Sequence, residues 1–199
     1  MAADPTTEPL MSSNPIDLLI AFEEATDVPI RPEYIEGAVC MPPPPDYDHN
    51  HGAMQLLLQL HAGGWHQVGV GCGFATVLEG EDVQTLVIPD FYVLNREPTE
   101  LDDAFRKVHK GWYPINMLAL AGEVTSGNPG TDTGPEYRSY ASAGVAVYVL
   151  VNREEKRAHA HFDPDPAARR YRSSYEAPLG EKLPLPAPYP ALDTSAFRL

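Results

Sequence analysis

The chain has 199 residues, with 14 basic and 28 acidic side chains and a formal net charge of −14. Its size and its hydrophobic fraction of 43% are typical of a domain with its own core, and no apolar run is long enough for a membrane-spanning helix. The acidic charge argues against binding nucleic acid through a broad basic surface, because phosphates are neutralised by positive charge. With two cysteines, the sequence also excludes a disulfide framework and a four-cysteine zinc site.

The two ends of the chain are rich in proline. Residues 1–14 have neither the basic nor the apolar region of a secretory signal, so we expect a disordered leader on a cytoplasmic protein. Residues 15–199 are expected to form a single domain that ends in a proline-rich tail.

The N-terminal part of this domain alternates helix and strand patterns. Asn14 precedes a proline and an apolar helical face, so a first helix is expected over about residues 15–26. Residues 33–41 predict a pair of strands that turns at Glu36 and the following glycine. An amphipathic helix is expected over 50–62, where two glycines end the pattern.

Three strands are expected in the middle of the chain. Residues 68–76 alternate apolar side chains with glycine, which predicts one apolar and one bare face. Residues 84–94 contain Pro89, which cannot donate a ladder hydrogen bond and therefore indicates a bulge or a strand end. Residues 115–124 are almost continuously apolar, as is typical of a central strand buried on both faces.

The C-terminal part adds one helix and further strands. A capping-box pattern that ends at Glu136 predicts a short helix over about 134–143. A buried strand over 145–151 and two solvent-facing strands over 157–162 and 169–176 follow. The sum is an α/β or α+β fold with a central mixed sheet flanked by helices.

Asp90 and Glu123 are the strongest candidate site residues. Each ends an apolar strand, where packing does not require a charge. If these strands pair, the two carboxylates come together, and converging oxygens are what a hard cation such as Mg²⁺ or Mn²⁺ prefers. Such an ion could activate water at a phosphodiester. The alternative is that both carboxylates are only solvated or salt-bridged.

The order of these motifs resembles the PD-(D/E)xK nuclease superfamily and is similar, more narrowly, to the bacterial putative restriction endonuclease family. The resemblance rests on a Pro-Asp pair at one strand end, Glu-Val-Thr-Ser at another, and the helix RSYASAGV before the strand VAVYVLVN. YIEG in the early hairpin and the tail GEKLPLPAPYPALDTSAF extend it from about Pro32 to Phe197. The resemblance implies a restriction-endonuclease-like domain over 15–199 and metal-dependent hydrolysis of DNA.

This resemblance also implies roles for individual residues. Asp90 and Glu123 match the two motif carboxylates, which bind the metal and act in catalysis. Glu36 matches the early glutamate, and the backbone carbonyl of Val124 would be a further metal ligand. His51 lies where the family has a histidine and is expected to line the substrate cleft.

The chain departs from the family pattern at the motif lysine. Thr125 stands two residues after Glu123, at the lysine position, and Glu136 aligns with the position from which the narrower family supplies its lysine. Arg138 is the nearest cation and could stabilise charge in catalysis, but a guanidinium stays protonated and cannot act as a general base. Glu136 has a structural alternative, because it can cap its own helix.

Other polar groups are candidates for substrate contacts. Thr125 lies next to the carboxylates, and Arg170 and Arg172 share one face of a strand, where they could bind phosphate. A solvated strand face is the alternative for these arginines. The pair His49-x-His51 is expected on an extended segment, with both imidazoles on one side. Two histidines are too few for a zinc site, which needs a third protein ligand.

We therefore expect an endonuclease that depends on Mg²⁺, or on Mn²⁺, and that has an atypical active site and DNA as its partner. We expect no membrane association, and a homodimer is a possible assembly. Two alternatives remain, because one fold hosts many functions. A degenerate member that has lost the lysine could act as a binding or interaction protein. The acidic site could also serve another metal-assisted reaction on a small substrate.

Overall fold

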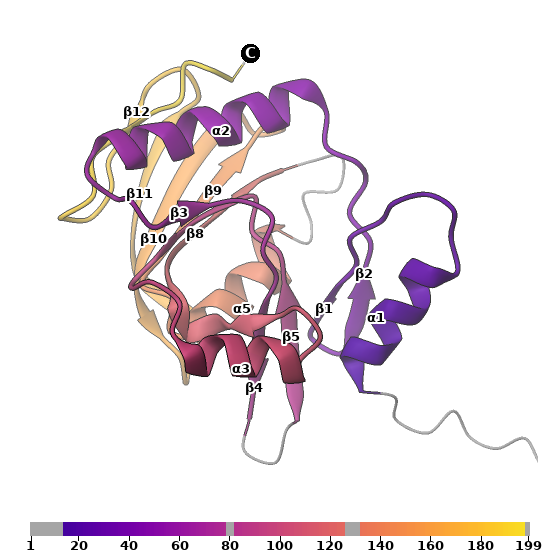
Figure 1. Cartoon of the computed structure of the whole chain (residues 1–199). Helices are drawn as coiled ribbons and strands as arrows, with labels where there is room; N and C mark the ends of the chain where they lie inside the picture. Colours follow the sequence, from indigo (N-terminus) through magenta and orange to yellow (C-terminus); the bar gives the residue numbers. More distant parts are fainter. Residues whose placement is uncertain (1–13, 79–81, 126–131, 198–199) are drawn as a thin grey trace, which may run out of the picture.

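The computed structural model describes residues 14–78, 82–125 and 132–197 (Figure 1). The expected leader lies outside these residues except for Asn14, whose side chain accepts a hydrogen bond from the Ile16 amide at 3.0 Å. This bond caps the first helix, as the sequence predicts. Within the described part of the chain, no helix is long and apolar enough to span a bilayer.

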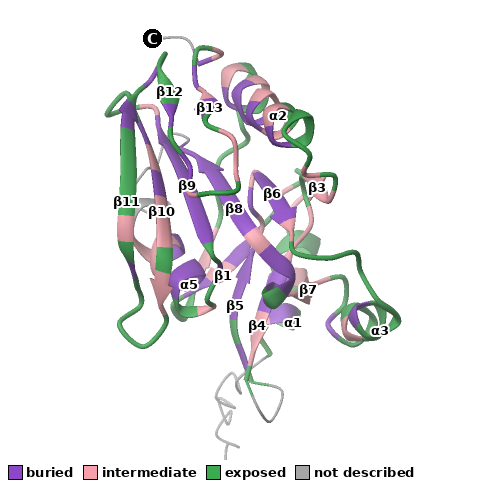
Figure 2. Ribbon diagram, turned by 90° about the vertical axis from the view of Figure 1, so that its left-hand side faces the viewer, coloured by how far each residue is buried: buried purple, intermediate pink, exposed green. Residues whose placement is uncertain are grey.

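The helices pack on or beside the sheets (Figures 1 and 2). They are α1 (Pro15–Glu24), α2 (Tyr47–Ala62), α3 (Glu100–Val108) and α5 (Tyr137–Ser142), with a 3-10 turn over Ile115–Met117 and a π-helical turn over Asp132–Glu136.

The described residues form two larger sheets. The first has the order β2–β1–β5–β4–β7, in which only the β4–β7 pair is parallel. Its strands are β1 (Glu33–Ile35), β2 (Ala38–Cys40), β4 (Phe74–Val77), β5 (Val83–Val87) and β7 (Tyr113–Pro114). The predicted hairpin of 33–41 is confirmed, with positive φ at Glu36 and Gly37 in its turn.

The second sheet has the order β11–β10–β9–β8–β6–β3. Its strands are β3 (Val68–Gly69), β6 (Phe91–Leu94), β8 (Leu118–Val124), β9 (Val147–Asn152), β10 (Arg157–Asp165) and β11 (Arg170–Pro178). The β8–β9 pair is parallel and the other pairs are antiparallel, so the sheet is mixed. The α+β fold with mixed sheets and flanking helices is thus as expected.

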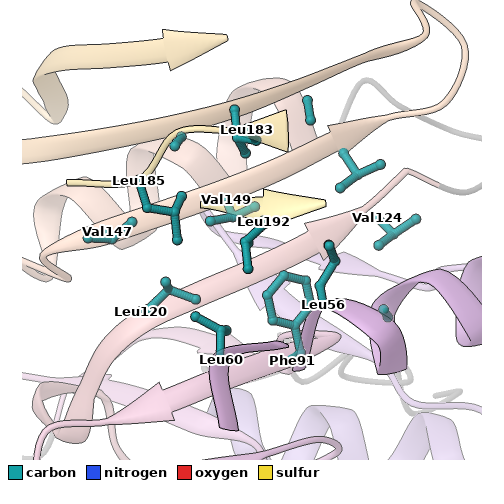
Figure 3. Packing of buried hydrophobic residues seen from close by; sticks show 14 of the residues in the cluster. Leu56, Leu60, Phe91, Leu120, Val124, Val147, Val149, Leu183, Leu185 and Leu192 are labelled. Atoms are coloured by element: carbon teal, nitrogen blue, oxygen red, sulfur yellow. The ribbon is translucent and has the colours of Figure 1, made fainter. Parts of the chain in front are cut away.

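Helix α2 covers one face of the second sheet. Leu56 and Leu60 are fully buried against Phe91 and Leu120, as Figure 3 shows. The C-terminal segment completes this core through the short strands β12 (Lys182–Leu183) and β13 (Leu192–Asp193). The proline-rich tail therefore takes part in the core.

The opposite face of the second sheet packs against α5 and the first sheet. Tyr140 and Ala141 of α5 are fully buried with Ala121 of β8 and Tyr148 of β9. Strand β8 is consequently buried on both faces, as predicted, but it begins at Leu118 and not at residue 115, because Ile115–Met117 form the 3-10 turn.

Two predicted strands are wrong as single elements, because each is divided between the sheets. Residues 68–76 form β3 and β4, separated by a turn with Gly71 at φ +77°. Residues 84–94 form β5 and β6, which belong to different sheets. Pro89 lies between them, so it marks a strand end and not a bulge.

The helix boundaries also differ from those predicted. Helix α2 begins at Tyr47 and not at residue 50, because Asp46 caps it by accepting a hydrogen bond from the His49 amide at 2.8 Å. The predicted helix over 134–143 is a π-helical turn followed by α5, and the side chain of Thr133 lies outside the described residues.

The packing of β6 on β8 generates a first testable prediction. Gly122 pairs with Phe91, and a methyl group at residue 122 would overlap the phenyl ring. We expect Gly122→Ala to lower the free energy of unfolding by about 1–3 kcal/mol, as overpacking usually does. Urea denaturation measures this change. Adding Phe91→Leu should relieve the overlap, so additive losses in the double variant would contradict this packing.

Candidate active site

Asp90 and Glu123 meet where β6 runs antiparallel to β8. The Phe91–Gly122 pair places the preceding Asp90 beside Glu123. The Asp90 amide lies 3.4 Å from Glu123 Oε2, and Asp90 Oδ2 accepts a hydrogen bond from the Val124 amide at 2.8 Å. The expected convergence of these two carboxylates is therefore present in the structure.

Two further carboxylates lie in the same cavity. Glu33 of β1 is 5% exposed and accepts a hydrogen bond from the Ile88 amide. Glu136, at the start of α5, is also 5% exposed. The cavity has a volume of about 320 Å³ and is lined by the residues Val28, Pro29, Ile30, Arg31, Glu33, Pro42, Pro43, Pro44, Pro45, His49, Ile88, Asp90, Glu123, Val124 and Glu136.

Glu123 is a cavity carboxylate whose pKa is shifted by its surroundings. Burial raises the pKa of Glu123 well above its usual value, and the charges of Glu136, Asp90 and Glu33 raise it further. The Tyr140 hydroxyl opposes this shift by donating a hydrogen bond of 2.7 Å to Glu123 Oε1. Glu123 is therefore surrounded by like charge, a condition that a bound cation would relieve.

His49 is the histidine that reaches the carboxylates. Because α2 begins at Tyr47, His49 is helical and 5% exposed, and its Nε2 lies 3.0 Å from Asp90 Oδ1. Its Nδ1 has no hydrogen-bond partner among the described residues. His51 instead stacks on Tyr47 with a ring-centroid distance of 5.5 Å and does not line the cavity. The placement of His49 and His51 on an extended segment is therefore wrong.

Glu36 and Arg138 contact each other, but outside the acidic cavity. Glu36 lies in the β1–β2 turn and accepts hydrogen bonds from Arg138 Nε at 2.8 Å and Arg138 Nη2 at 2.7 Å. Arg169 binds the same carboxylate, and these arginines hold the pKa of Glu36 below its usual range. Glu36 and Arg169 line a separate pocket of about 850 Å³. The carboxylate of the early strand pair that lines the acidic cavity is Glu33.

Three residues predicted to contact the substrate, Thr125, Arg170 and Arg172, do not line the acidic cavity. Thr125 is 1% exposed; its amide donates to the Val151 carbonyl and its hydroxyl accepts from the Arg153 amide, both at 2.9 Å. Thr125 thus connects the end of β8 to the end of β9 through these two hydrogen bonds. Arg170 and Arg172 are exposed on β11, which is separated from β8 by two strands. Arg172 pairs with acidic side chains of β10.

Sequence reasoning did not assign Glu33, Tyr140 or Arg31 to the site, and it considered His49 only as part of a zinc pair. Glu33 and Ile35 lie on the same buried face of β1, because side chains alternate along a strand. This alternation could have indicated that the Glu33 side chain points inward. Arg31 lines the cavity, is exposed, and donates a hydrogen bond to the Gly71 carbonyl. Among the described residues, no group of three or more His, Cys, Asp or Glu side chains is arranged as a ready metal site.

Comparison with known proteins agrees with this fold. A putative nuclease belonging to DUF820 from Anabaena variabilis aligns with a TM-score of 0.58 and 15% sequence identity, covering 90% of this chain and 96% of that one. This likeness shows a shared fold. No curated protein matches the chain. The family model Uma2, described as putative restriction endonuclease, matches residues 21–196. The chain therefore belongs to the Uma2 family, as its sequence motifs indicated.

Proposed function

We propose that this chain is a divalent-metal-dependent endonuclease that hydrolyses DNA phosphodiester bonds at the acidic cavity. The observation that carries the proposal is the convergence of Asp90 and Glu123 in that cavity, in a chain whose family is described as putative restriction endonuclease. Paired carboxylates that lie at adjoining strand ends and face a cavity are suited to hold a cation against a phosphate.

The donor chemistry of the cavity fits Mg²⁺ or Mn²⁺. Asp90, Glu123 and the Val124 carbonyl would supply oxygen ligands, the type that both ions prefer. Mg²⁺ usually takes one or two protein carboxylates, with water and substrate phosphate completing its shell, so a three-carboxylate site is unnecessary. When bound, the ion would polarise the phosphoryl group and lower the pKa of a coordinated water.

The protein side chains hold and position these ligands. His49 and the Val124 amide each bind one oxygen of Asp90, which fixes the orientation of its carboxylate. Tyr140 does the same for Glu123. Arg31, which lines the cavity, would attract a phosphate electrostatically but could not accept a proton.

A second candidate function is binding without cleavage. Thr125 stands in place of the motif lysine and is hydrogen-bonded to Val151 and Arg153 at the end of β9, while Glu136 adds a carboxylate to the cavity. An additional negative charge strengthens cation binding but repels phosphate. Metal binding with no cleavage of any nucleic acid would favour this second function.

The assignment of the acidic cavity is tested by charge-removing variants. We expect Asp90→Asn and Glu123→Gln to reduce Mn²⁺-dependent plasmid cleavage by at least about 100-fold, because ligands of the ion are lost. Glu33→Gln should reduce it less. These rates are measured with wild-type protein at the same metal concentration.

Glu36→Gln is the matched control, because Glu36 lies in the separate pocket with Arg169. This variant should retain wild-type cleavage. If it lost activity as fully as Asp90→Asn, the catalytic site would have to include the β1–β2 turn, as the family resemblance alone suggests.

Metal affinity should depend on pH through Glu123. Its pKa is raised in the folded protein, so its contribution to folding stability is complete below its ordinary value of 4.5 and is lost as pH rises through the folded pKa. Divalent metal binds the ionised form, so Mn²⁺ affinity should rise with pH over that range, by up to about tenfold per pH unit. Isothermal titration calorimetry measures this rise.

Tyr140→Phe separates this effect from general pH changes. The variant removes a hydrogen bond that lowers the pKa of Glu123, so its Mn²⁺ binding curve should move to higher pH. A curve that coincides with that of the wild type would show that Glu123 is not the titrating group.

A further inference from the structure

The outer face of α2 carries large apolar side chains in contact with solvent. Tyr47 is 67% exposed, Met54 43% and Leu58 49%. Together with two histidines they follow spacings of four and three residues, which align them along one side of a helix. We call this set the α2 stripe, and its members are Tyr47, His51, Met54, Leu58 and His61.

The core and the C-terminal segment cover two other sides of α2. Leu56 and Leu60 point into the core (Figure 3). The C-terminal segment covers one flank, where Gln59 Nε2 donates to the Asp193 carbonyl at 2.9 Å. The Phe197 ring lies against Gly52 on the same flank. The α2 stripe is left on the outside of the molecule, where Figure 1 shows this helix.

The charge pattern of α2 sets it apart from the rest of the surface. Its 16 residues include one acidic side chain, Asp48, and no lysine or arginine. The whole chain has a net charge of −14. Asp46, just before the helix, is paired with Arg153 at 2.9 Å. Depletion of charged side chains, with Tyr47 and Met54 among the exposed residues, is typical of an interface core.

We propose that the α2 stripe is the contact surface of a symmetric homodimer, in which two α2 helices pack antiparallel across a two-fold axis near Met54. Met54 lies midway between Tyr47 and His61, so this axis would pair Met54 with itself and Tyr47 with His61 of the partner subunit. Alternating spacings of four and three residues suit a helix–helix seam.

The second copy is favoured as the partner by symmetry and by charge. Two acidic chains repel each other wherever charged surfaces meet, and the α2 stripe offers a surface without carboxylates. Antiparallel packing also places the acidic first turn of one helix beside the histidine-bearing last turn of the other, which suits both helix dipoles. This inference does not depend on nuclease activity.

Sedimentation equilibrium over the micromolar range tests the proposal. Wild-type protein should reach twice its monomer mass, and Met54→Glu should raise the dimer dissociation constant by at least about tenfold, because two carboxylates would face each other. The matched control is Leu101→Glu on α3, which replaces a side chain that is 82% exposed outside the stripe. It should leave the dissociation constant unchanged.

A monomeric wild type at every concentration would overturn the proposal, as would equal weakening by Leu101→Glu. Salt gives a second readout. An uncharged seam between two acidic chains should tighten as added salt screens their repulsion, whereas weakening by salt would indicate a charged interface elsewhere.

The axis itself is tested by cross-linking. Met54→Cys should form an intermolecular disulfide under mild oxidation, because the two substituted positions would meet at the axis. Leu101→Cys and the wild type, with its half-buried Cys40 and Cys72, are the controls. A dimer in which the Met54→Cys variant fails to cross-link faster than these controls would overturn the antiparallel arrangement.

Discussion

Burial of β8 on both faces is the constraint that organises this protein. Side chains that point to one face pack under α2, and those that point to the other pack against α5 and the first sheet. A strand in this position must be almost wholly apolar, and β8 is so up to Gly122. Glu123 is the exception, and its carboxylate enters the layer that contains Tyr140.

The cost of that burial explains the surroundings of Glu123. An isolated buried carboxylate is strongly unfavourable, so its negative charge needs hydrogen-bond donors or a cation. Tyr140 and the Asp90 amide supply donors, but Asp90, Glu33 and Glu136 add like charge. The cavity thus brings four carboxylates together in a chain of net charge −14. This concentration of negative charge agrees with the proposed cation-dependent function.

Helix α2 connects the core, the cavity and the outer surface. Its inward side chains Leu56 and Leu60 complete the main core, while His49 near its first turn holds Asp90. Its outward face carries the α2 stripe. Because α2 already begins at Tyr47, His49 is helical and lies on the same buried side of the helix as Leu56 and Leu60.

Local patterns in the sequence were sufficient for much of this fold. The apolar run of 115–124 contains a strand buried on both sides, Asn14 caps a helix, and the hairpin of 33–41 forms as predicted. The proximity of Asp90 and Glu123 was also predictable, since each is the misplaced charge at the end of an apolar strand.

Other features depended on contacts between distant segments. Residues 68–76 and 84–94 each read as one strand, because periodicity does not show that a chain leaves one sheet for another. Glu36 matched a motif, yet the tight turn directs it to Arg138 and Arg169, and Glu33 faces the carboxylates instead. The sequence by itself determined which segments are buried and where charge is out of place. Only the tertiary structure decided which charges meet, because their convergence depends on strand order and on the residue at which α2 begins.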